Sequence, residues 1–222
     1  MPAKPKTKTS KTTKTAAART ATNATKKAVA RPKRPATKAK APSPPTGAPK
    51  PLAPGATRKV GATTATVLDG PRANTLTLRL SRTIKAPAER IYQCFLDADA
   101  YAKWLPPHGF TGKVHHMEPK VGGTYRMSFN TINRSWGHTF GGTYTELVPN
   151  KRIVHTDRFE TNDPAAQGEL TVAIDLTPVA GGTRIDIVQS GIPKGPMADG
   201  APYGWSQSLE NLARMCEQEL PF

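Results

Sequence analysis

The first 70 residues contain no Phe, Tyr or Trp, and residues 1–72 hold one acidic residue, Asp69, against 17 Lys and Arg. Without large apolar side chains, such a segment cannot bury enough surface to offset the entropy cost of folding. The sequence therefore predicts residues 1–72 to be a disordered basic tail and linker. Residues 73–222 hold 15 basic and 15 acidic residues, so the formal net charge of +16 comes entirely from the first third of the chain.

Cysteine is also scarce, since the chain contains only Cys94 and Cys216. Two cysteines do not make a disulfide framework, so a reducing compartment is expected. No run approaches the roughly 20 apolar residues that a membrane-spanning helix needs. The N-terminus also lacks the apolar core of a secretory signal. These absences predict a cytoplasmic protein, with nucleoid association as a further expectation for the basic tail.

The tail carries its cations at intervals along a chain rich in Ala, Thr and Pro, a composition that resembles linker-histone-like and nucleoid-associated proteins. Cations spaced along a flexible chain neutralise phosphates without reading bases. Non-specific nucleic-acid binding is one interpretation, and a solubilising linker is the other. The candidate polyanion-binding residues are Lys4, Lys6, Lys8, Lys11, Lys14, Arg19, Lys26, Lys27, Arg31, Lys33, Arg34, Lys38 and Lys40.

From Ala73 onward, the chain alternates between strand and helix patterns. Apolar and polar side chains alternate over residues 74–84, as in a half-buried strand. Two short helices are expected next, over 86–98 and up to Trp104, with Asp99 as the N-cap of the second. An amphipathic helix over 205–220 follows a Gly-Pro loop. Between these helices, six strands are expected, at 112–119, 122–130, 136–148, 151–159, 169–179 and 183–190.

Two turns, at 149–150 and 180–181, fix the expected strand pairing in the second half of the chain. Pairing that is symmetric about these turns places Tyr144 opposite His155 and Ile174 opposite Ile187. A one-sided antiparallel sheet around the C-terminal helix would then bury every apolar stripe. The fold class is therefore predicted to be α+β.

Five motifs appear in an order typical of one superfamily. They are IKAPAERIYQCFLDADAYAKWLPP at 84–107, PKVGGTYRMSF at 119–129, FGGTYTELVPNKRIVHT at 140–156, GGTRIDIVQSG at 181–191 and GWSQSLENL at 204–212. This order resembles the SRPBCC superfamily, also called START-like or helix-grip. Within it, the chain resembles the branch named after activators of heat-shock-protein ATPase and the polyketide cyclase-like proteins. The resemblance assigns residues 73–222 to this domain.

The resemblance implies a curved antiparallel sheet that wraps a long C-terminal helix, with a deep cavity between them. It also implies that the two short helices close the mouth of the cavity, where Trp104 belongs. The chain departs from many relatives at "PKVGG", where they carry Arg-Pro, and at Gln189, where a His is frequent. Neither departure breaks the fold, and both argue against carrying over a catalytic role.

The leading interpretation is a non-catalytic protein that binds an apolar small molecule, such as a lipid, a polyketide or an aromatic compound. No cofactor and no metal are expected, because His115 and His116 are adjacent on a strand and no Cys-His cluster is present. The candidate cavity residues are Trp104, Phe110, Tyr125, Met127, Phe129, Trp136, His138, Phe140, His155, Trp205 and Leu209.

Two other functions stay open. One is a cyclase- or dehydratase-like enzyme, in which His138, His155, Tyr144 or Arg126 would transfer protons or orient a polyketide-type substrate. The other is a co-chaperone-like interaction module. The chain has no nucleophile elbow, Walker loop or dinucleotide-binding motif. Its three Gly-Gly-Thr triplets are explained by turns and bulges rather than by phosphate binding.

Overall fold

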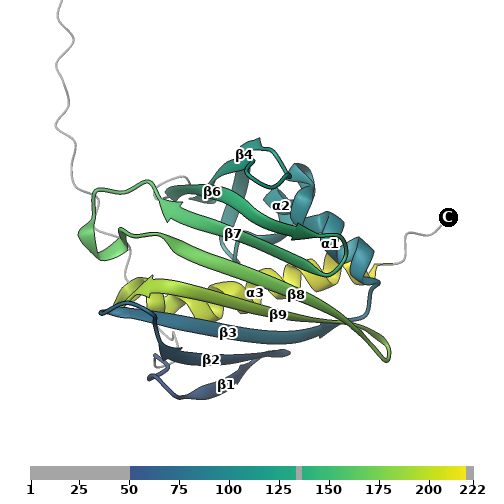
Figure 1. Cartoon of the computed structure of the whole chain (residues 1–222), viewed down its shortest axis with the longest axis horizontal. Coiled ribbons are helices and arrows are strands. Elements are labelled where there is room, and N and C mark those ends of the chain that lie inside the picture. The colour runs from purple at the N-terminus through teal and green to yellow at the C-terminus, as the bar shows by residue number, and fades with distance from the viewer. Residues whose placement is uncertain (1–50, 134–136, 219–222) are drawn as a thin grey trace, which may run out of the picture. The chain divides into compact units, whose positions relative to one another are not determined.

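A computed structural model describes residues 51–133 and 137–218, and the strands within these ranges form a single antiparallel sheet (Figure 1). The strands lie in the order β1-β2-β3-β9-β8-β7-β6-β5-β4 across the sheet. They are β1 (Thr57–Val60), β2 (Thr63–Asp69), β3 (Thr75–Ile84), β4 (Phe110–Met117), β5 (Thr124–Thr131), β6 (Gly137–Val148), β7 (Arg152–Phe159), β8 (Leu170–Val179) and β9 (Gly182–Pro193).

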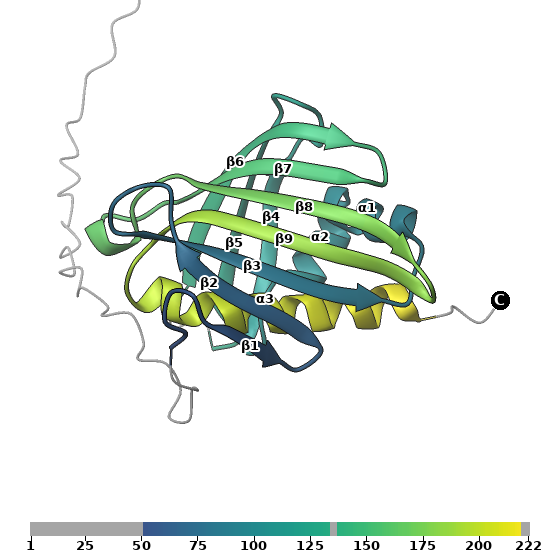
Figure 2. The ribbon, with the colours of Figure 1, turned by 60° about the horizontal axis from the view of Figure 1, so that its bottom comes forward.

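Three α-helices accompany the sheet in the described residues. Helices α1 (Ala88–Leu96) and α2 (Ala98–Trp104) follow β3, and α3 (Pro196–Glu217) follows β9. A short 3-10 turn, η1 (Pro164–Ala166), connects β7 to β8. Figure 1 looks onto the outer face of the curved sheet with α3 behind it, and Figure 2 shows α3 running along the open side. The predicted α+β helix-grip fold is confirmed.

The core lies between the concave face of the sheet and the three helices. Strand alternation points one side chain in two towards this space, and those side chains are almost all apolar. Leu80, Ile174 and Ile187 on the sheet are 0–2 % exposed, and Leu209 and Leu212 on α3 are completely buried. Burial of this apolar area is the main favourable contribution to folding.

The predicted pairing of the second half is confirmed. Tyr144 pairs with His155 across β6 and β7, and Ile174 pairs with Ile187 across β8 and β9. The register is fixed because a slip by one residue would turn every apolar side chain to solvent.

The predicted boundary between tail and domain is wrong, because the folded sheet begins well before Ala73. Strands β1 and β2 form a hairpin, and β2 pairs with β3 from Thr64 opposite Ser81 to Asp69 opposite Leu76. Ala65 and Val67 on β2 are 0 and 3 % exposed, so this hairpin contributes to the core. Its Thr- and Ala-rich sequence has the composition of the tail, which hides the alternation.

Two helix starts also differ from the prediction. Helix α3 begins at Pro196 rather than after the Gly-Pro loop, and it contains Pro202 in its interior. Pro202 is buried, so tertiary packing compensates for the backbone hydrogen bond that proline removes. The N-cap of α2 is Asp97, not Asp99, and the Asp97 Oδ1 accepts a 2.7 Å hydrogen bond from the Ala100 amide.

Candidate functional site

A buried polar cluster interrupts the apolar concave face where β5, β6 and β7 lie side by side. The Tyr125 hydroxyl lies 2.8 Å from Asp157 Oδ1 and 3.1 Å from His155 Nδ1. All three side chains are less than 9 % exposed. His155 Nδ1 also lies 3.0 Å from the Thr156 carbonyl, which only accepts, so Nδ1 carries the proton. The Tyr125 hydroxyl proton is therefore directed to Asp157. We call these three residues the polar cluster.

Burial changes the protonation of the polar cluster. It raises the pKa of Asp157 from 3.8 to about 7, although hydrogen bonds from Tyr125 and from the Arg158 amide act in the opposite direction. Burial lowers the pKa of His155 from 6.5 to about 4, so its imidazole is neutral at pH 7. Burial also raises the pKa of Tyr125 well above 10, with Asp157 adding to the shift. The polar cluster therefore holds one proton that titrates near neutral pH.

An aromatic cluster lies next to the polar cluster on the same face of the sheet. It comprises Phe110, Phe129, His138, Phe140 and Phe159, whose ring centroids are 5.0–6.5 Å apart. Phe129 and Phe140 are buried, whereas the other three rings are half-buried. Burial lowers the pKa of His138 from 6.5 to about 4. The aromatic cluster therefore presents a partly exposed apolar surface made of neutral rings.

The cap formed by α1 and α2 holds Trp104 in its interior. Trp104 is 0 % exposed, and its indole Nε1 donates a 2.8 Å hydrogen bond to the Cys94 carbonyl. Its ring packs against Phe95 and Tyr101, at centroid distances of 4.7 and 5.4 Å. Tyr101 in turn lies 6.2 Å from the ring of Tyr125, so the cap covers the polar cluster directly.

Helix α3 closes the other side of the concave face. Leu209 is completely buried, and the half-buried Trp205 donates a 2.8 Å hydrogen bond from Nε1 to Gln189 Oε1 on β9. The structure thus brings Phe110, Tyr125, Met127, Phe129, His138, Phe140 and His155 together on the sheet, and Trp205 and Leu209 on the facing helix. Trp136 and the thirteen candidate cations of the tail lie outside the described residues.

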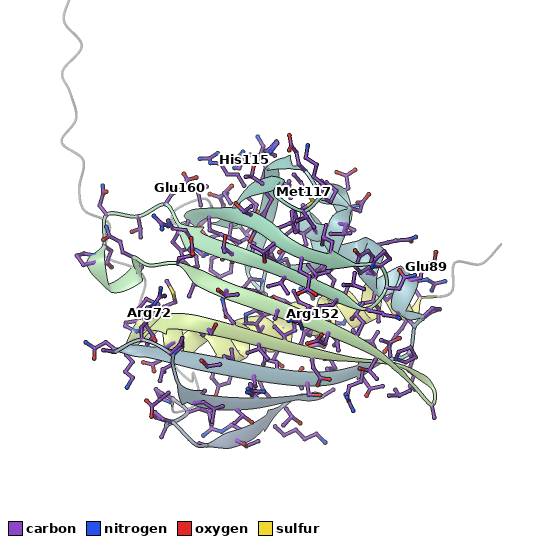
Figure 3. The ribbon with its side chains drawn as sticks, viewed as in Figure 1. Arg72, Glu89, His115, Met117, Arg152 and Glu160 are labelled. Carbon is purple, nitrogen blue, oxygen red and sulfur yellow. The ribbon has the colours of Figure 1, made fainter. Side chains whose placement is uncertain are left out.

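Sequence reasoning missed Asp157, the residue with the most perturbed carboxyl group of the site. Asp157 lies two positions after His155 on β7, so strand alternation places both on the same face. The two-residue spacing of His155 and Asp157 on a predicted strand could therefore have identified Asp157 as a site residue. Arg126, one of the four residues named for proton transfer or substrate orientation in the enzymatic alternative, faces the other way. It forms a bidentate ion pair with Glu160 on the outer face, and Figure 3 labels Glu160 there.

The outer face of the sheet carries ion pairs. Arg152, labelled in Figure 3, lies between Asp175 and Glu146, with N–O distances of 2.6 and 3.0 Å. His115 Nε2 lies 2.9 Å from the Ser128 hydroxyl, and His116 lies 4.0 Å from Glu118. Among the described residues, no group of three or more His, Cys, Asp and Glu is placed to hold a metal ion.

Two of the hollows on the described part of the chain lie away from the concave face. One, of about 500 Å³, lies between the start of α1 and the β8–β9 turn. The other, of about 270 Å³, is lined by Pro71, Arg72, Glu169, Thr171, Ser190 and Gly191. None of the candidate cavity residues lines either hollow. The space between the sheet and α3 is occupied by side chains in this conformation.

Comparisons with known proteins agree with this geometry. Residues 85–217 match the family described as "Activator of Hsp90 ATPase homolog 1-like protein". The crystal structure of protein CV1439 from Chromobacterium violaceum is 45 % identical, with a TM-score of 0.61 over 64 % of this chain and 98 % of that one.

Protein MLL2253 from Mesorhizobium loti is 25 % identical, with a TM-score of 0.51 over 65 % of this chain and 99 % of its own. Protein Ms6760 from Mycobacterium smegmatis shares the fold at 19 % identity, with a TM-score of 0.55 over 70 % of this chain and 99 % of its own. No curated protein matches the chain. In the ranges that the structure describes, no helix is long and apolar enough to cross a membrane.

Proposed function

Because the chain belongs to the Activator of Hsp90 ATPase homolog 1-like family, we propose that it uses the helix-grip fold to bind an apolar small molecule. The ligand is a lipid, a polyketide or an aromatic compound, held between the concave face and α3. The observation that carries this proposal is the polar cluster. It is a hydrogen-bonded group of three side chains on an otherwise apolar face, beside half-buried aromatic rings.

The two clusters suit a ligand with an apolar body and one polar end. Phe129 and Tyr125 both point inward from β5 and are four residues apart, which is about 13 Å along a strand. Met127 lies between them and is completely buried. The aromatic cluster would contact the apolar body, and the polar cluster would take a hydroxyl or carbonyl group of the ligand.

Ligand binding in this site requires side chains to move, because the described conformation fills the space. The aromatic cluster is the candidate access point, since Phe110, His138 and Phe159 are its half-buried members. The apolar area that these rings lose from water on binding would supply the affinity, and the hydrogen bond to the polar cluster would supply orientation.

The test is a thermal-shift and native mass-spectrometry screen with lipids, polyketides and aromatic compounds. A bound ligand should raise the melting temperature, and Tyr125→Phe, which removes one hydroxyl group, should weaken its binding about 10-fold. Arg126→Gln, at the neighbouring position on the outer face, is the matched control and should bind as the wild type does. If no compound of the three classes stabilises the protein, the proposal fails.

An enzymatic function is a second candidate, favoured by the pKa of about 7 for Asp157. A group that titrates near neutral pH suits general acid–base catalysis, and Asp157 is hydrogen-bonded to a second proton carrier, Tyr125. A product assay on a polyketide-type substrate separates the two functions. Lost turnover with retained binding in Asp157→Asn or His155→Ala would favour the enzyme, whereas unchanged turnover would exclude these groups from catalysis.

No specific observation in the described residues favours the co-chaperone-like function. Such a role needs contiguous exposed apolar area. The exposed large apolar side chains are Val121, Ile132, Val148 and Val179, and they lie in four separate segments of the chain. We therefore do not propose it.

For the tail, we propose non-specific binding to polyanions such as DNA or RNA. Residues 1–50 hold 14 Lys and Arg and no acidic residue, which leaves 18 basic and 16 acidic residues in 51–222. The full chain should bind duplex DNA with an affinity that falls steeply with salt, because each neutralised phosphate releases counterions. Fluorescence anisotropy on the full chain and on residues 51–222 tests this. If affinity and salt dependence persist without residues 1–50, the tail is not the binding segment.

A further inference from the structure

The two cysteines of the chain meet at the contact between the cap and α3. Cys94 lies on α1 and Cys216 near the end of α3, 122 residues later, yet their sulfur atoms are 3.6 Å apart. The Met215 sulfur lies 3.9 Å from Cys94 Sγ. We propose that Cys94 and Cys216 form a redox-active dithiol that peroxides oxidise to an intramolecular disulfide linking α1 to α3. This inference does not depend on the proposed ligand or on the tail.

The geometry requires little movement to form the bond. A disulfide has an S–S distance of about 2.05 Å, so the two sulfurs need to approach by about 1.6 Å. The helices that carry them are already held together, because the Arg90 guanidinium donates a 2.9 Å hydrogen bond to the Cys216 carbonyl. The Cys94 carbonyl is also fixed, as the acceptor of the Trp104 indole.

The two thiols differ in solvent exposure and in pKa, as the attacking and resolving thiols of such a reaction should. Cys94 is half-buried, so a small oxidant can reach it, whereas Cys216 is completely buried. The hydrogen bond from Cys216 is the largest influence on the pKa of Cys94 and lowers it, with Arg90 acting in the same direction, while partial burial and the nearby Asp97 act against them. The same hydrogen bond and burial raise the pKa of Cys216. Cys94 is therefore the attacking thiol, and Cys216 is the thiol that resolves the intermediate.

The reaction with a peroxide balances in two steps. The Cys94 thiolate attacks one peroxide oxygen, the O–O bond breaks, and the leaving hydroxide takes a proton to become water, which leaves Cys94 as a sulfenic acid. The Cys216 sulfur then attacks the Cys94 sulfur. The S–S bond forms, the S–O bond breaks, and the second water leaves with the Cys216 proton. The thiol pair loses two electrons, and the peroxide gains them.

The experiment treats the reduced full-length protein with equimolar hydrogen peroxide and then counts thiols and measures the intact mass. We expect both thiols to be lost, the mass to fall by two hydrogen atoms, and a peptide pair linking α1 to α3 to appear under non-reducing conditions. The melting temperature should rise by roughly 5–15 °C, because the bond closes a long loop, and dithiothreitol should reverse the change. Two persistent thiols, over-oxidation of Cys94, or only intermolecular dimers would overturn the proposal.

Single-cysteine variants test the assigned order of attack. In Cys216→Ala, a sulfenic acid at Cys94 should accumulate and be trapped by dimedone. In Cys94→Ser, the remaining thiol should react with a thiol reagent on the order of 10-fold more slowly than Cys94 does, until the protein is unfolded. Equal reactivity of the two thiols would show that the order is wrong. The wild-type measurement decides on the disulfide itself even if a variant fails to fold.

Discussion

Asp157 and His155, two titratable side chains of the polar cluster, make the stability of the protein depend on pH in opposite directions. Asp157 has a pKa raised by burial, so the folded protein holds a proton there that the unfolded chain has lost above pH 4. His155 has a pKa lowered by burial, so the unfolded chain holds a proton between pH 4 and 6.5 that the folded protein excludes. As pH rises, the contribution of Asp157 therefore lowers the free energy of unfolding, whereas the contribution of His155 raises it.

Asp157→Asn should become more stable than the wild type as pH rises. The Asn oxygen still accepts from Tyr125, but it carries no charge to be buried. The difference in unfolding free energy should be small near pH 4, grow up to pH 7, and then stay constant at about 2–4 kcal/mol. Urea unfolding of both proteins at pH 4.5, 6 and 8 measures it. An equal difference at all three values would mean that Asp157 titrates as an exposed carboxyl group does.

His155→Gln should show the opposite dependence. The variant loses packing at every pH, and its deficit relative to the wild type should grow by about 2–3 kcal/mol between pH 4 and 6.5, where the excluded proton matters. The same urea series checks this. A deficit that shrinks over this range would contradict a neutral, buried His155.

At the scale of single elements, the predictions that succeeded rest on alternation between well-defined turns. Tyr144 and His155 were paired correctly because the turn at 149–150 separates two long apolar-polar patterns. The β1–β2 hairpin was missed because its sequence resembles the tail, and its burial depends on β3 and α3. The segment around Pro202 was predicted as a loop because of its Gly and Pro residues, whereas in the structure Pro202 is buried inside α3. Trp104 was assigned to the mouth of a cavity, but its side chain is completely buried. This burial depends on packing against Phe95 and Tyr101, which the local sequence pattern does not predict.

Among the glycines of β6, Gly142 leaves the least room for a side chain. A Cβ atom at this position would collide with the Thr156 carbonyl oxygen on β7, next to Asp157. Gly142→Ala should therefore destabilise the protein by about 2–4 kcal/mol, since backbone has to move and the polar cluster moves with it. Chemical unfolding measures the loss.

Gly200→Ala in α3 is the matched control for Gly142→Ala. A Cβ there meets no atom within 4 Å, and Ala is the better helix former, so stability should stay the same or rise by about 0.5–1 kcal/mol. If both variants lose stability equally, the close approach of β6 to β7 is not the cause.

For the whole molecule, the position of the first strand decides which fragment folds. Residues 51–222 keep the β1–β2 hairpin, and residues 73–222 lose it. The shorter fragment would expose the edge of β3 and remove two hydrogen bonds to α3, from Arg58 to Tyr203 and from Ser206 to the Val60 carbonyl. We expect 51–222 to unfold at the same urea concentration as the full chain, and 73–222 to lose at least about 3 kcal/mol or to aggregate.

Equal stability of the two fragments would show that the hairpin is dispensable. Such a result would also support the domain boundary at Ala73 that composition alone predicts. Far-UV circular dichroism of both fragments is the accompanying measurement, because it separates loss of the hairpin from loss of the sheet.

The position of β3 between β2 and β9 has a consequence for the order of events during synthesis. On one side β3 pairs with β2, which the ribosome has just made, and on the other with β9, whose residues emerge roughly 100 positions later. The nascent chain can therefore complete a three-stranded meander early, but the apolar side of that meander stays uncovered until translation reaches α3. During this interval the emerging protein is most exposed to misassembly, and chaperones that hold nascent chains would have their main opportunity to act.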